Sequence, residues 1–163
     1  MMLYHVNAGW PVVSEHSRLI SPTRVAVPRD GDARIEAEKY ASFPPPQKDF
    51  AERVYFLDNM ANANGMVNLG IVNEKLNIGL FVKYPKSEFP YFIEWKQTGQ
   101  GEYVVGLEPA NSTGRNRAEM RRDGTLEFIE PGQERQFTLE LGVITGVDEI
   151  SELEEKAAKV LTP

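Results

Sequence analysis

Hydrophobic and polar residues alternate along much of the chain from residue 54 onward. In Leu76–Tyr84 an apolar residue occupies every second position, which predicts a strand with one buried face. The segment 65–72 is also predicted to be a strand, and Asn73–Lys75 between the two predicts the turn of a β-hairpin. Further strands are predicted at 91–95, 103–107, 125–129 and 136–143. We therefore expect a mostly β fold built on a largely antiparallel sheet.

Helices are predicted at two places only. Residues 33–41 favour a short helix, which is followed by the rigid Phe-Pro-Pro-Pro connector at 43–46. Ser151–Glu154 matches a capping box and predicts a helix that ends at residue 161. The apolar stripe of this helix, expected to pack on the edge of the sheet, comprises Leu153, Ala157 and Val160.

The composition restricts the kinds of partner and cofactor. A chain of 163 residues with 41% hydrophobic and 26% charged residues suits one globular domain, here 1–163. The net charge of −6 argues against nucleic acid, because phosphate binding requires a basic excess. Neither a membrane-length apolar run nor a signal-peptide pattern is present, so we expect a cytoplasmic protein without a membrane partner. With no cysteine and two histidines, we expect neither a metal site nor a cofactor.

Two proton-transferring residues lie in strand-like segments that are far apart in the sequence. His5 lies in a strand predicted from Leu3 to Val6. Glu108 follows the apolar run 104–107 and precedes a proline. An imidazole and a buried carboxylate are suited to acid–base chemistry near neutral pH, and burial should raise the pKa of Glu108. A single strand histidine is more often structural, and Glu108 could equally form a salt bridge with Arg115 or Arg117.

Three further residues are weaker candidates for contacts with a ligand. Glu52 interrupts the aromatic-rich run 50–56, where a charge needs a partner; an ion pair with Arg53 or a solvent-facing position explains it equally well. Trp95 and Lys96 place an aromatic face beside a cation, as in sugar sites, although a strand tryptophan is more often part of a core.

Arginines cluster in 115–122, as they do in patches that bind phosphate or nucleic acid. Glu119 and Asp123 are interleaved with these cations, and the whole chain is acidic. A solvated loop is therefore the better interpretation of this segment.

Several motifs together resemble the aldose 1-epimerase (galactose mutarotase-like) superfamily, and in particular its uncharacterised branch. They are Tyr4–Pro11, Phe50–Tyr55, Phe89-Pro90 with Glu94–Lys96, Gly106–Asn111, Gly114-Arg115, Gly124–Leu126 and Pro131-Gly132. The resemblance spans nearly the whole chain, and the second and fourth motifs are the most specific. It implies an antiparallel β-sandwich of the galactose mutarotase type, present in part and ending in a short helix.

The resemblance also implies roles for the candidate residues. His5 matches the histidine that protonates the ring oxygen of the sugar, and Glu108 matches the base that takes the proton of the anomeric hydroxyl. Glu52 matches an aspartate that binds sugar hydroxyls, with a longer side chain here. The weaker matches, expected to contact hydroxyls or an anionic substituent, are Asn111, Arg115 and Lys96. No metal or cofactor is implied.

Members of this superfamily are roughly twice as long as this chain. The chain begins almost at the motif that contains His5, so the resemblance implies the C-terminal part of a longer protein. Exposed apolar sheet surface would then pair with the missing N-terminal half or with another copy in a homo-oligomer.

The sequence leaves three functions open. The leading one is a sugar 1-epimerase acting on an aldose or a related sugar. The alternatives are a carbohydrate-binding β-sandwich without catalysis and a structural β domain that needs a partner chain. They differ in one requirement: an epimerase needs His5 and Glu108 within reach of a single sugar ring.

Overall fold

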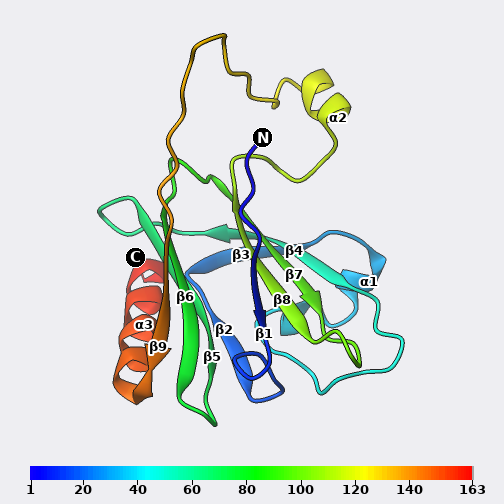
Figure 1. Cartoon of the computed structure of the whole chain (residues 1–163), viewed down its shortest axis with the longest axis vertical. Helices are drawn as coiled ribbons and strands as arrows, with labels where there is room; N and C mark the ends of the chain where they lie inside the picture. Colours follow the sequence, from blue (N-terminus) through cyan, green and yellow to red (C-terminus); the bar gives the residue numbers. More distant parts are fainter. Residues whose placement is uncertain (163) are drawn as a thin grey trace.

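Two antiparallel sheets face each other in the computed structural model, which describes residues 1–162 (Figure 1). The five-stranded sheet runs in the order β1 (Val6–Gly9), β8 (Val104–Ala110), β7 (Tyr91–Gln97), β4 (Arg53–Asn59) and β3 (Thr23–Pro28). The four-stranded sheet runs in the order β2 (Ser17–Ile20), β5 (Met66–Asn73), β6 (Ile78–Pro85) and β9 (Glu140–Thr145). The predicted mostly β, antiparallel sandwich is thus confirmed.

The main core lies between the two sheets. Every second residue of the strands points into this core, as the alternation of apolar and polar residues predicts. Its fully buried members include Leu69, Ile71, Val82, Tyr84, Phe89 and Leu107. Consequently the alternate residues of β4, β7 and β8 point to the opposite, outer face of the five-stranded sheet.

Helix α3 (Gly146–Leu161) covers the outer face of the four-stranded sheet (Figure 1). It begins five residues before the predicted start, since the Glu149 carboxylate accepts the backbone N–H of Thr145 at 2.6 Å. Leu153 and Ala157 of the predicted stripe are buried, while Val160 is half-buried. Leu153 and Ala157 pack with Val72 and Ile144 on the face of the sheet, so the prediction of an edge position was wrong.

Residues 33–41 form less helix than predicted. Helix α1 (Gly31–Arg34) is followed by a single 3₁₀ turn, η1 (Ala37–Lys39). The chain between them passes through Glu36 with φ of 60°, a left-handed conformation that interrupts a continuous helix.

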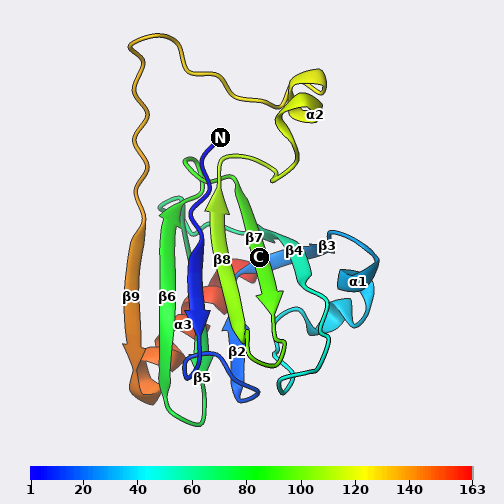
Figure 2. The same ribbon diagram turned by 45° about the vertical axis from the view of Figure 1, so that its right-hand side comes forward.

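Residues 113–136 leave the sandwich as an arm that carries helix α2 (Arg117–Arg122; Figures 1 and 2). The strand predicted at 125–129 is absent, because no strand within residues 1–162 lies beside this segment to pair with it. Its Phe128 and Ile129 side chains are exposed. The last strand, predicted at 136–143, begins later, at Glu140, where pairing with β6 begins. The first strand, predicted from Leu3, begins at Val6.

Across residues 1–162, no helix has both the length and the apolar character needed to cross a membrane.

Candidate functional site

The register of β1 and β8 places His5 directly beside Glu108. Val6 pairs with Leu107, so the residues just outside that pair, His5 and Glu108, also lie opposite each other. Their side chains meet on the outer face of the five-stranded sheet, with His5 Nε2 2.9 Å from Glu108 Oε1. The structure therefore brings together the two residues that the sequence selected for acid–base chemistry.

Glycine at position 106 leaves room for this contact. A Cβ atom there would lie 2.6 Å from Glu108 Oε1 and 2.9 Å from His5 Cε1, which is closer than carbon and oxygen atoms tolerate. Gly106 pairs with Asn7 on one side and with Trp95 on the other. The floor of the site between these two residues is thus bare backbone.

Asn7 and Trp95 orient the imidazole of His5. The Nδ1 atom of His5 lies 2.7 Å from Asn7 Oδ1, so an Nδ1–H donates to this amide oxygen and Nε2 is left facing Glu108. The Trp95 ring stands edge-to-face to the imidazole, with centroids 5.6 Å apart. The imidazole is therefore held in one orientation while 45% of its side chain remains exposed to solvent.

The two partners of the pair differ strongly in their environment. The Glu108 side chain is only 7% exposed, and this burial raises the pKa of its carboxyl group, as the sequence predicted. The nearby His5 opposes that rise, while the charge of Glu52 adds to it. A carboxylate that is reluctant to stay ionised, next to an exposed imidazole, is arranged to accept a proton from a bound molecule.

Glu52 lies at the other side of Trp95, one residue before β4. Its Oε2 accepts the indole N–H of Trp95 at 2.6 Å, and its Oε1 accepts an N–H of Arg29 at 2.7 Å. These bonds, that of Trp95 first, lower the pKa of Glu52. The ion-pair partner is thus Arg29 and not Arg53, and Glu52 is a fixed anion with 44% of its side chain exposed.

Lys96 lies away from this site, although it follows Trp95 directly. Successive strand residues point to opposite faces, so Lys96 points inward. Its Nζ donates to the backbone carbonyls of Lys39, Tyr40 and Ser42 at 3.2, 2.8 and 2.6 Å. The Lys96 ammonium group thus holds the segment 39–42 against the sheet.

Asn111 and Arg115 lie at the start of the arm, beyond β8. Asn111 Nδ2 donates to Glu127 at 2.9 Å, and its Oδ1 accepts the backbone N–H of Met2 at 2.6 Å. Arg115 donates to Asp123 at 2.9 Å. These bonds join the arm to the N-terminal residues and to itself.

Three residues of the site were not selected from the sequence: Asn7, Arg29 and Gly106. Asn7 lies two residues after His5, hence on the same face of the strand, and this spacing is a signal that could have identified it. Arg29 is brought to Glu52 by the pairing of β3 with β4, a long-range contact with no local signal.

The donor set does not favour a metal ion. Within residues 1–162, no three histidine, cysteine, aspartate or glutamate side chains are grouped as a metal site requires. What the site offers is one imidazole, one buried carboxylate, one fixed carboxylate and an aromatic ring on an exposed sheet face.

Comparisons with known proteins bear on the fold and the family of the chain. The chain superimposes, with a TM-score of 0.91 and 25% sequence identity, on a crystal structure described as a putative aldose 1-epimerase from Klebsiella pneumoniae subsp. pneumoniae. The match covers 98% of this chain and 42% of that one, so this chain spans less than half the length of its structural neighbour. No curated protein sequence matches. The fold is thus a mutarotase-like β-sandwich, and since the family model matches residues 1–143, the chain belongs to the family described as "Domain of unknown function (DUF4432)".

Proposed function

We propose that the protein acts as a sugar 1-epimerase, which interconverts the anomers of an aldose or a related sugar. The observation that carries the proposal is the 2.9 Å contact between His5 Nε2 and Glu108 Oε1, in which the His5 side chain is 45% exposed to solvent and that of Glu108 is 7% exposed. The fold shared with the aldose 1-epimerase-like neighbour supports it. The proposal includes two expectations from the sequence: the ligand is a small carbohydrate, and the protein is cytoplasmic.

The chemistry needs two proton transfers at one carbon atom. Glu108 takes the proton of the anomeric hydroxyl, while protonated His5 gives a proton to the ring oxygen, and the bond between the anomeric carbon and the ring oxygen breaks. The resulting aldehyde rotates about its bond to the next carbon, and the reverse transfers close the ring on the other face. Because both oxygens belong to the same hemiacetal carbon, their proton partners must be neighbours, as His5 and Glu108 are.

Glu52 and Trp95 supply binding in this proposal. Glu52 is held ionised by Arg29 and by the Trp95 indole, so its carboxylate can accept hydrogen bonds from sugar hydroxyls. The half-buried Trp95 ring beside His5 offers an apolar surface to the C–H groups of a sugar. Neither role requires a proton transfer.

Substitution of Glu108 by Gln tests the proposal. The variant keeps the shape of the carboxyl group but cannot accept the proton, so we expect anomer interconversion to fall at least 100-fold, the order contributed by general-base catalysis. Freshly dissolved α-D-glucose and α-D-galactose, followed by NMR of their anomeric protons, provide the measurement. Glu102→Gln, an exposed carboxylate in the loop before β8, is the matched control and should retain the wild-type rate.

A non-catalytic carbohydrate-binding protein is the second candidate. It is favoured by the Glu52–Trp95 contact, which forms a polar and aromatic surface that can bind a sugar without any proton transfer. Sugar binding without any wild-type acceleration of anomer interconversion would establish this alternative and exclude the epimerase.

A further inference from the structure

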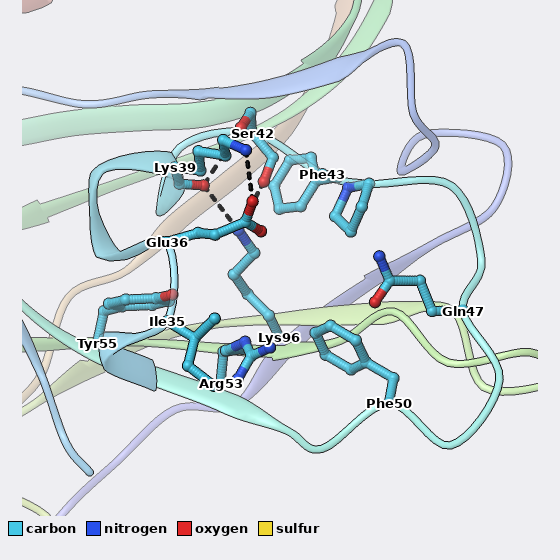
Figure 3. Close-up of a pocket in the computed structure, with 11 residues that line it drawn as sticks. Ile35, Glu36, Lys39, Ser42, Phe43, Gln47, Phe50, Arg53, Tyr55 and Lys96 are labelled. Carbon is cyan, nitrogen blue, oxygen red and sulfur yellow. Dashed lines mark hydrogen bonds and ion pairs between the residues drawn. The ribbon is translucent and has the colours of Figure 1, made fainter. Parts of the chain in front are cut away.

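A cavity of about 270 Å³ lies on the inward side of β4, behind the strand that follows Glu52 (Figure 3). Arg53 and Tyr55 of β4 point into it, because they alternate with Val54, which belongs to the other face. Segment 35–50 forms the opposite wall. The cavity is therefore separate from the His5–Glu108 site, although Glu52 on the outer face directly precedes β4.

The wall of this cavity is fixed to the sheet at three points. Lys96 Nζ binds three carbonyl groups of segment 39–42, with distances of 2.6 to 3.2 Å. The Tyr103 hydroxyl donates to the carbonyl of Pro44. The backbone N–H of Gln47 donates to the carbonyl of Thr98 at 3.1 Å, and the carbonyl of Gln47 accepts the backbone N–H of Gln100 at 2.9 Å. The cavity is thus preformed, which lowers the entropic cost of filling it.

Aromatic side chains contribute much of the lining of the cavity. The rings of Phe43, Phe50 and Tyr55 lie around it (Figure 3). The guanidinium of Arg53 lies 5.1 Å from the centre of the Phe50 ring, and the ammonium of Lys96 lies 4.8 Å from that of Phe43. A flat apolar molecule would therefore meet rings on its faces and cations at its edge.

The charge of the lining is positive in a chain of net charge −6. Three cations, Lys39, Arg53 and Lys96, border the cavity with one acid, Glu36. Glu36 is paired with Lys39, and Lys96 donates to carbonyls. Arg53 donates to the carbonyl of Asp32, and within residues 1–162 it has no carboxylate partner.

From this lining, we infer a second binding site that takes a small organic carboxylate with a flat apolar body. The guanidinium of Arg53 donates two N–H groups to the two carboxylate oxygens, as arginine does with planar oxyanions. Phe43 and Phe50 hold the apolar body. The inference is independent of the proposed epimerase activity, since the acid–base pair lies on the other face of the sheet.

Benzoate is a suitable probe for the test. We expect it to bind the wild-type protein, measured by calorimetry and by shifts of backbone amide NMR signals in segment 35–55. Benzyl alcohol, which has the ring without the charge, and acetate, which has the charge without the ring, should each bind at least tenfold more weakly.

Two variants make the test decisive. Arg53→Gln should weaken benzoate binding at least tenfold, while Arg34→Gln, an exposed arginine of α1 outside the lining, should leave it unchanged. Ile35→Trp places a larger side chain at the exposed rim of the cavity and leaves Arg53 unchanged. We expect the remaining space to be too small for the ring of benzoate, so this variant should abolish benzoate binding.

Failure of the second site is distinguishable from failure of the epimerase. Glu108→Gln should keep full benzoate affinity even where anomer interconversion is lost. Equal benzoate affinity in the wild type, Arg53→Gln and Ile35→Trp would overturn the inference, as would the absence of benzoate-induced shifts in 35–55 at millimolar concentration.

Discussion

The acid–base pair depends on single residues that carry no charge themselves. Gly106 is the clearest case, because any side chain there would occupy the space between the His5 imidazole and the Glu108 carboxylate. Asn7 acts from the other side, where its amide oxygen fixes which nitrogen of His5 faces the carboxylate. The site therefore depends on a glycine at position 106 as much as on His5 and Glu108 themselves.

Gly106→Ala should separate the pair. The added Cβ lies 2.6 Å from Glu108 Oε1, so the carboxylate or the imidazole must move, and we expect anomer interconversion to fall at least tenfold. Gly9→Ala is the matched control on the neighbouring strand β1, where the Cβ would meet one carbonyl oxygen at an ordinary 3.6 Å. NMR of the anomeric protons measures the rate; equal rates for the two variants would contradict this account of Gly106.

The alternate residues of strand β7 lie in two different environments. Trp95 points to the acid–base pair, whereas Glu94 and Lys96 point into the interior. Glu94 is fully buried, and neither carboxyl oxygen has a hydrogen-bond partner within residues 1–162. Burial raises the pKa of Glu94 from 4.5 to about 8, and the nearby Lys96 opposes this rise.

The buried Glu94 should make the stability of the protein fall as the pH rises. Between pH 4.5 and about 8 the folded state holds a proton on Glu94 that the unfolded state has lost, so the free energy of unfolding declines over this window. Glu94→Gln removes the proton exchange. We expect the stability of this variant relative to wild type to increase steadily from pH 5 to 8 in urea unfolding monitored by fluorescence. A constant difference across that range would contradict a raised pKa.

Helix α3 is attached to the sandwich by a small apolar contact of its own. Leu153 is 7% exposed and packs with Val72 and Ile144 on the four-stranded sheet. Leu153→Ala should lower the free energy of unfolding by about 2–5 kcal/mol through lost burial and the cavity left behind. Glu152→Ala, an exposed position of the same helix, should change it by less than about 0.5 kcal/mol in the same urea titration.

Sequence patterns predicted the elements unevenly, for physical reasons. The hairpin of β5 and β6 was predicted within about two residues, because strict alternation and a local turn specify it. The segment 125–129 has the same alternation but no neighbouring strand, and pairing is a property that a local pattern cannot report. Helix α3 starts early because the Glu149 carboxylate accepts the N–H of Thr145, well before the capping signal at Ser151.

The candidate site was predicted in part for the same reasons. His5 and Glu108 were selected from their residue types and from the family resemblance, while their contact follows from a register between strands about a hundred residues apart. Trp95 and Lys96 were selected together, yet the period of two places them on opposite faces. The residue types indicated the chemistry, but which side chains lie on the same face depends on the register of the paired strands.

At the scale of the whole molecule, strand β4 separates the two proposed binding regions. Glu52, just before it, belongs to the outer face with the acid–base pair, whereas Arg53, its first residue, borders the inner cavity. Segment 29–34 touches both, since Arg29 binds Glu52 and the Asp32 carbonyl accepts Arg53. The two regions are therefore linked by hydrogen bonds through one short segment.

The sandwich also ends in an exposed strand edge that should promote self-association. Strand β9 is the last strand of the four-stranded sheet, and its Leu141 and Val143 side chains are 50% and 68% exposed. An apolar edge with free backbone groups is a template for pairing with another chain, and a lysine there opposes such pairing. We expect Val143→Lys to reduce concentration-dependent association in sedimentation velocity. Leu76→Lys, which places the same charge at an exposed apolar residue in the turn before β6, should sediment as the wild type does, and equal sedimentation of all three proteins would exclude the β9 edge as the associating surface.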